Sequence, residues 1–153
     1  MKAVDRTVIT LLALLMVLPG LSSCSVPNLE SRDCTEARER VREFYSFHFG
    51  NDMHPTLENV ERRQRFLTEE YAAGLRLDAS GLPPTKIDYF TLTEDLPKAF
   101  RVGECKLVEP GRETRFEVLL FWKDDTRSEQ KEITAIAKKE NNEWLIDAVG
   151  PKE

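Results

Sequence analysis

Hydrophobic positions recur with a helical period in the first half of this 153-residue chain and with a strand period in the second half. Over residues 33–49 one stripe is formed by Ala37, Val41, Phe44, Tyr45, Phe47 and His48. Asp33 with Glu36 three residues later is a capping-box signal, and Gly50 is typical of the position just past a helix end. This pattern predicts a first helix that buries an aromatic face.

A second helical period begins after Thr56, which is a suitable N-cap, and continues to about residue 76. Its inward face is predicted to contain Leu57, Val60, Gln64, Leu67, Tyr71 and Leu75. Thr68 followed by Glu69 and Glu70 is a second start signal, and threonine is unfavourable inside a helix. We therefore predict two shorter helices with a break near Leu67.

From residue 98 onward the period changes to two, which predicts β-strands over residues 100–108, 114–123, 128–139 and 144–149. Turn-forming pairs separate these strands, namely Pro110 and Gly111, Asp124 and Asp125, and Asn141 and Asn142. Helices followed by consecutive strands predict an α+β fold, in which the N-terminal helices pack on an antiparallel sheet.

The amino-terminal segment has two basic residues, Lys2 and Arg6, then an apolar run over residues 8–18, then small residues that lead to Cys24. The run would form roughly 16 Å of helix, whereas a hydrocarbon core is about 30 Å thick. This order resembles a bacterial lipoprotein signal peptide with its lipobox. The resemblance implies cleavage after Ser23 and acylation of Cys24, palmitate included, which would anchor the chain to a membrane. A permanent transmembrane helix and an ordinary secretory signal are the open alternatives.

These features divide the chain into a signal peptide (residues 1–23), a lipidated cysteine with a flexible tether (24–32) and a single domain (33–153). Ser25 follows the cysteine, and the absence of aspartate at this position resembles outer-membrane sorting in bacteria with two membranes. The implied location is the cell envelope and, if the source has two membranes, the outer membrane with the domain facing the periplasm.

The chain is acidic. Its formal net charge is −5, and loss of Lys2, Arg6 and Asp5 with the signal peptide changes it to −6. Nucleic-acid binding depends on cations that neutralise phosphates, and the sequence has no cluster of them. We therefore expect no nucleic-acid partner and no electrostatic attraction to anionic lipid, so the acyl chains would do the anchoring.

If Cys24 carries lipid, Cys34 and Cys105 remain, and an even pair in an oxidising compartment favours a disulfide. The loop that it would close is about 70 residues long, and the chain-entropy model gives such a constraint roughly 4 kcal/mol. The alternative is that Cys105 is a small buried hydrophobic residue and Cys34 a free thiol.

The order of helices and strands resembles the nuclear-transport-factor-2-like superfamily, the cystatin-like cone. The resemblance is carried by the ending W-x-I-D-x-V, at Trp144, Ile146, Asp147 and Val149, and by residues 66–71, which are similar to the second helix of that superfamily. Asp88-Tyr89-Phe90 followed by residues 95–97 is similar to a family of envelope lipoproteins of unknown function. The resemblance covers about residues 35–150 and implies a curved sheet wrapped around the helices, with a cone-shaped cavity. Some members of the superfamily use this cavity for acid–base catalysis, and many others are binding modules.

Candidate lining residues of such a cavity are Tyr45, His48, Tyr71, Asp88, Asp95, Trp122 and Trp144. An acid–base enzyme would hold some of them in an apolar pocket, where desolvation moves pKa values toward neutrality. The alternative is a core tyrosine beside a hydrogen-bonded histidine. We assign no catalytic residue, because no isomerase motif matches residue by residue. The two histidines, His48 and His54, lack metal-ligand spacing and no phosphate-binding motif occurs, so we expect no metal and no cofactor.

The leading hypothesis is a non-enzymatic, lipid-anchored envelope protein that binds a protein, a peptidoglycan fragment or a small apolar ligand. A periplasmic immunity protein or inhibitor is a specific form of this hypothesis. The alternative is a small isomerase, dehydratase or hydrolase, which requires at least two of Tyr45, His48 and an aspartate to converge in a closed apolar cavity. A third hypothesis is a structural role through a homodimer formed across the sheet.

Overall fold

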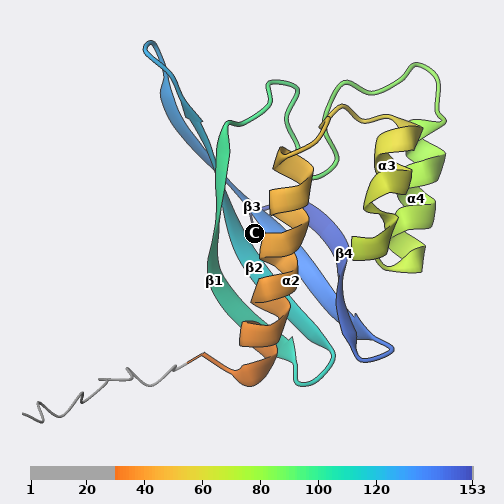
Figure 1. The fold of residues 1–153 in the computed structure, drawn as a ribbon, viewed down its shortest axis with the longest axis vertical. Helices are drawn as coiled ribbons and strands as arrows, with labels where there is room; N and C mark the ends of the chain where they lie inside the picture. The colour runs from red at the N-terminus through yellow and green to blue at the C-terminus, as the bar shows by residue number, and fades with distance from the viewer. Residues whose placement is uncertain (1–29, 153) are drawn as a thin grey trace, which may run out of the picture.

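The computed structural model describes residues 30–152, which form three α-helices packed against a four-stranded antiparallel sheet (Figure 1). The predicted α+β class is confirmed. The predicted signal peptide, Cys24 and residues 25–29 lie outside the described residues. Among the helices described, none combines the length and the apolar character needed to cross a membrane.

Helix α2 (Arg32–Phe49) buries the face that the sequence predicts. Its buried side chains are Cys34, Ala37, Val41, Phe44, Tyr45 and His48. The N-cap, however, is Ser31 and not Asp33, because the Ser31 hydroxyl accepts a hydrogen bond from the Cys34 N–H at 3.2 Å. The Asp33 carboxylate instead accepts a hydrogen bond from the Gly111 N–H at 2.8 Å. The predicted capping carboxylate therefore fixes a turn of the sheet.

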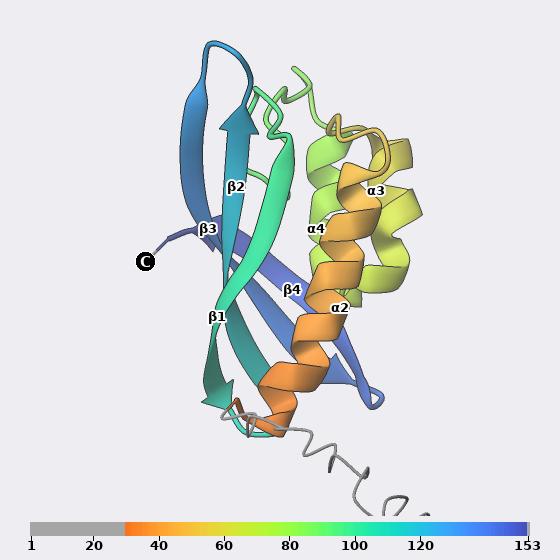
Figure 2. The same cartoon turned by 60° about the vertical axis from the view of Figure 1, so that its left-hand side comes forward.

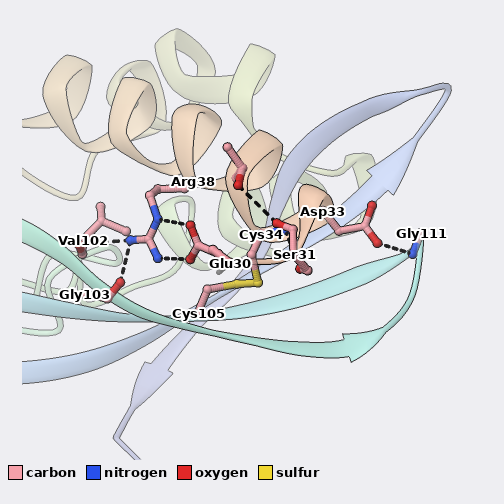
Figure 3. The surroundings of a disulfide bond; sticks show 10 residues. Glu30, Ser31, Asp33, Cys34, Arg38, Val102, Gly103, Cys105 and Gly111 are labelled. Carbon is pink, nitrogen blue, oxygen red and sulfur yellow. Dashed lines mark hydrogen bonds and ion pairs between the residues drawn. A yellow bond between two sulfur atoms is a disulfide. The ribbon is translucent and has the colours of Figure 1, made fainter. Parts of the chain in front are cut away.

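The folded domain also extends further toward the amino terminus than the sequence predicts. Glu30 forms an ion pair with Arg38, and this pairing lowers the pKa of Glu30. The Arg38 guanidinium also donates to the carbonyl oxygens of Val102 at 3.3 Å and Gly103 at 2.5 Å (Figure 3). Residues 30–32 therefore belong to the domain and not to a flexible tether.

The second helical segment is broken near Leu67, as predicted. Before the break lie α3 (Leu57–Arg63) and a short 3₁₀ helix, η1 (Gln64–Phe66), and after it lies α4 (Glu69–Ala79). Leu67 pairs with Ile146 of the sheet, and the Thr68 N–H donates to the Ile146 carbonyl at 2.9 Å. The Thr68 side chain then caps α4 by accepting a hydrogen bond from the Tyr71 N–H. The break exists because the backbone at these two residues pairs with a strand.

The inward face of α3 differs from the prediction. The buried residues are Asn59, Val60 and Arg63, whereas Gln64 is exposed and Leu57 keeps 40 % of its surface exposed. The prediction for Leu57 and Gln64 was wrong because the interior holds partners for Arg63, and these partners turn the polar side of the helix inward.

The sheet contains β1 (Ala99–Glu109), β2 (Glu113–Lys123), β3 (Ser128–Glu140) and β4 (Glu143–Pro151), in the spatial order of the sequence. The helices lie on one face of it (Figure 2). Phe116, Val118 and Leu120 of β2 are fully buried in the core beneath them. Asn141 and Asn142 form the tight β3–β4 turn with φ angles of 48° and 67°, as two-residue hairpin turns with positive φ require.

A disulfide joins Cys34 in the first turn of α2 to Cys105 in β1 (Figure 3). Its Cα atoms are 5.9 Å apart, which lies in the usual range for disulfides. The two cysteines are 71 positions apart in sequence, so the bond closes a long loop in the unfolded chain. Together with the contacts of Asp33 and Arg38, the disulfide fixes the amino-terminal end of α2 to the sheet.

Replacing both cysteines by alanine, Cys34→Ala with Cys105→Ala, should lower the free energy of unfolding by about 4 kcal/mol, because the unfolded chain regains the freedom of a long loop. Urea denaturation followed by tryptophan fluorescence measures this loss. A reductant should bring the wild-type protein to the stability of the double variant and leave the variant unchanged. Equal stability of the oxidised wild-type protein and the double variant would contradict the expectation.

Candidate functional site

Three buried polar side chains lie in a row where α2, α3 and the loop before β1 meet. The Arg63 Nε–H donates to His48 Nδ1 at 2.7 Å, and His48 Nε2 lies 3.0 Å from Asp88 Oδ2. Their exposed fractions are 1 % for Arg63, 0 % for His48 and 1 % for Asp88. We call these three residues the buried charge cluster.

The imidazole of His48 is neutral in this arrangement. Because Nδ1 accepts a hydrogen bond from a guanidinium, the ring proton lies on Nε2 and is donated to Asp88. Burial lowers the pKa of His48, the hydrogen bond and charge of Asp88 oppose this change, and the charge of Arg63 adds to it. A neutral ring therefore bridges a buried cation and a buried anion.

Other polar atoms of the buried charge cluster are paired as well. Arg63 donates to the carbonyl oxygens of Asn59 at 2.8 Å and Asp52 at 2.7 Å. Asp88 Oδ2 accepts hydrogen bonds from the Thr91 N–H at 2.8 Å and from the Thr91 hydroxyl at 2.7 Å. Buried ions are costly unless they are compensated in this way. The cluster therefore holds α2, α3 and two loops together.

Aromatic side chains enclose the cluster. The His48 ring is parallel to Phe44, with 5.9 Å between centroids, and lies edge-on to Phe90 at 5.1 Å and to Phe49 at 5.9 Å. Tyr45 is fully buried beside them, and its hydroxyl donates to the Phe90 carbonyl at 3.0 Å. Burial raises the pKa of Tyr45 well above its usual value. His48 and Tyr45 are thus both sealed from solvent.

This geometry meets one requirement of the acid–base hypothesis and not the other. His48 and Asp88 converge within hydrogen-bonding distance. A general acid or base must also reach a bound substrate, and here protein atoms enclose both side chains. The arrangement favours a structural role, in which the cluster holds the loop around Asp88 against the ends of two helices.

The remaining residues that the sequence suggested as cavity lining lie in separate places. Asp95 pairs with Arg127 of the β2–β3 turn, and the Asp95 carbonyl accepts a hydrogen bond from the Trp122 indole N–H at 3.0 Å. Trp144 lies under the Lys139 ammonium, which is 5.4 Å from its ring centre. Tyr71 lines a cleft on α4. Asp88 contributes to the wall of the same cleft as Tyr71, whereas Asp95, Trp122 and Trp144 do not line it.

Sequence reasoning did not find Arg63. Arginine is rarely buried, and its neighbour Arg62 is exposed, so hydropathy gives no sign of its position. One signal was available: Arg63 lies three residues after Val60 and four after Asn59, which places all three on one side of a helix.

An apolar cleft of about 660 Å³ opens between α4 and the loop that follows it. These two elements lie at the upper right of Figure 1. Its apolar lining includes Leu75, Leu77, Leu82, Ile87, Leu92 and Val149. Leu82 is 93 % exposed, Leu77 77 % and Ile87 51 %. Large apolar side chains that gather on a surface in this way are typical of interaction sites. We call this surface the apolar cleft.

The charged groups of the apolar cleft are acidic. Asp78 is its exposed carboxylate, whereas Asp88 contributes to the wall but is 1 % exposed and already paired with His48 and Thr91. No lysine or arginine of the described chain lines the cleft. The Tyr89 hydroxyl is buried at the cleft and has no hydrogen-bond partner within residues 30–152. Burial and the nearby charge of Asp78 raise the pKa of Tyr89. The cleft therefore combines exposed hydrophobic side chains with a carboxylate and an unsatisfied hydroxyl.

The loop that follows α4, which forms part of the apolar cleft, and the first described residues lie at opposite ends of α2 (Figure 1). At the first end, Asp33 contacts the β1–β2 turn. At the other end, His48 contacts Asp88, which lines the cleft. The 18 residues of α2 span roughly 27 Å between these two ends.

No protein-family model and no curated protein matches the chain. Among solved structures, its fold is similar to a chain in the crystal structure of the type VI native effector–immunity complex Tae3–Tai3 from Ralstonia pickettii. The TM-score is 0.59 and the sequence identity 17 %, over 76 % of this chain and 94 % of that chain. At this identity the similarity shows the fold alone.

The neutral state of His48 makes stability depend on pH. An unfolded histidine has a pKa of about 6.5, and burial lowers that pKa in the folded protein. Below about pH 6.5 the unfolded state binds a proton more readily than the folded state. The free energy of unfolding therefore decreases as the pH is lowered, until the pH is below the pKa of the folded state. Above about pH 6.5 the contribution is fully present.

The matched variant is His48→Gln, whose amide can accept from Arg63 and donate to Asp88 but does not titrate. Urea denaturation from about pH 7 to about pH 5 should show a steeper loss of stability for the wild-type protein than for the variant. The difference in slope should reach up to about 1.4 kcal/mol per pH unit. Parallel curves for the two proteins would show that His48 is not held neutral by burial.

Proposed function

We propose that this chain is a lipid-anchored protein of the cell envelope that binds another protein there, as an immunity protein or inhibitor does, and catalyses no reaction. The observation that carries the proposal is the contrast between two sites. The ionisable side chains that converge are enclosed, whereas the hydrophobic side chains of the apolar cleft are exposed. Such a surface suits protein binding and not proton transfer.

The structural comparison supports the proposal that the partner is another protein. The similar chain comes from a complex of an effector with an immunity protein, and the similarity extends over 94 % of that chain. Fold likeness alone does not determine function. It agrees, however, with the partner class that the exposed cleft suggests.

Three features of the chain support a location in the cell envelope. The amino-terminal pattern ends in Cys24 at the position of a lipobox cysteine. The disulfide between Cys34 and Cys105 suits an oxidising compartment outside the cytoplasm. Ser25 after the cysteine suits outer-membrane sorting, so the proposed location is the outer membrane with the domain in the periplasm.

The proposed anchor also gives the domain an orientation. Only a few residues separate Cys24 from Glu30, which is held at the amino-terminal end of α2. Acyl chains on Cys24 would keep this end near the membrane, and the apolar cleft at the opposite end of α2 would face the periplasm. A soluble partner could then reach the cleft.

We also propose that the domain is a cone of the nuclear-transport-factor-2-like type. The support is the order of helices and strands, the ending W-x-I-D-x-V, and a twisted sheet with α2 lying across its face (Figure 2).

A competition experiment tests the proposed function. Deleting the gene in the source bacterium should make the strain lose to its parent on a solid surface, because effector from neighbouring cells would no longer be neutralised. Expressing the wild-type chain should restore equal growth, and well-separated cells in liquid culture should grow equally throughout. Colony counts give the ratio of the two strains. A deletion strain that competes equally on the solid surface would contradict the proposal.

The Cys24→Ser variant is the control for the anchor. It should move from the membrane fraction to the soluble fraction and restore growth less well than the wild-type chain, because its position in the envelope is lost.

A further inference from the structure

We propose that the apolar cleft binds a segment of the partner protein in which a basic side chain stands beside a large apolar one. This inference rests on the proposed function, because it names the chemistry of the partner at the site described above. It is carried by the exposed side chains of Leu77, Leu82 and Ile87 and by the exposed carboxylate of Asp78.

The apolar part of the site is formed by α4 and by the loop that follows it. Leu77 lies near the end of α4, and Leu82 and Ile87 lie on the loop. Leu82 is almost fully exposed although it lines the cleft. Exposure of these apolar side chains to water is unfavourable, and packing of a partner's apolar side chain against them would bury their surface.

The polar part of the site suits a cation. Asp78 is exposed on α4, and no ion pair joins it to another residue within residues 30–152. A lysine ammonium or an arginine guanidinium of a partner can donate to the exposed carboxylate of Asp78.

Acidic residues next to the cleft also favour the binding of a basic side chain. Glu70, Asp78 and Asp147 line a second hollow that shares Tyr71, Leu75 and Asp78 with the apolar cleft, and Lys138 of this hollow pairs with Asp147. A second copy of this chain would therefore bring like charge to the site. An anionic lipid surface would do the same, and the proposed anchor lies at the opposite end of α2.

The test uses a displayed library of random peptides selected on the immobilised full-length chain. Enriched peptides should pair lysine or arginine with a large apolar residue. Two cleft variants, Leu82→Asp and Asp78→Lys, should each weaken the binding of an enriched, fluorescently labelled peptide by at least about tenfold in anisotropy measurements. Both positions are exposed, so both variants should unfold at the wild-type temperature.

The matched controls carry the same changes away from the cleft. Val108→Asp alters another exposed apolar residue, on β1, and Asp125→Lys alters an exposed carboxylate in the β2–β3 turn. Both should bind the peptide with nearly wild-type affinity. Enriched peptides without basic residues, a library that yields no binder, or equal loss in cleft and control variants would each overturn the inference.

The competition experiment separates this inference from the proposed function. If the Leu82→Asp and Asp78→Lys chains restore growth of the deletion strain as well as the wild-type chain does, the cleft is not the binding site although the chain still protects. If the wild-type chain itself gives no protection, the proposed function fails. Loss of protection in the cleft variants alone supports the inference.

Discussion

The structure depends on the compensation of two opposite charges in its interior. Arg63 and Asp88 are both almost fully buried, and the neutral ring of His48 joins them by hydrogen bonds of 2.7 and 3.0 Å. Removing one member of such an arrangement would leave an uncompensated charge in the core. For this reason α3 presents a polar residue inward, the loop around Asp88 folds against α2, and the wall of the apolar cleft has a defined position.

The two ends of α2 have different roles: one end attaches the helix to the sheet, and the other supports the apolar cleft. One end is fixed to the sheet by the Cys34–Cys105 disulfide and is the end closer in sequence to the proposed anchor, Cys24. The other end carries the buried charge cluster, and the apolar cleft lies beyond it. Groups that resemble catalytic residues thus stabilise the surface beside which a partner would bind.

Much of the fold could be predicted from hydrophobic periodicity. The face of α2, the break near Leu67 and the strand order follow from local patterns, because burial of apolar side chains decides them. The cap at Ser31 could not be predicted, since Asp33 is used by a turn that is distant in sequence. The face of α3 also depends on long-range partners, because an arginine is buried only where the rest of the fold supplies acceptors.

The candidate site also depends on contacts between residues that are distant in sequence, which local patterns do not predict. The sequence suggested His48 and Asp88, and the structure brings them together. Burial of the His48 ring is the main cause of its lowered pKa. The sequence did not suggest the third member, Arg63, whose hydrogen bond to Nδ1 leaves the ring proton on Nε2. The apolar cleft was not found, because exposed leucines in a loop have the same sequence pattern as buried ones.

The most direct test of the central claim is an NMR spectrum that correlates the imidazole protons and nitrogens of His48. The account predicts a neutral ring at neutral pH, with the proton on Nε2, no proton on Nδ1, and an Nε2–H protected from exchange with water. A charged imidazolium, or a ring that titrates like an exposed histidine, would contradict it.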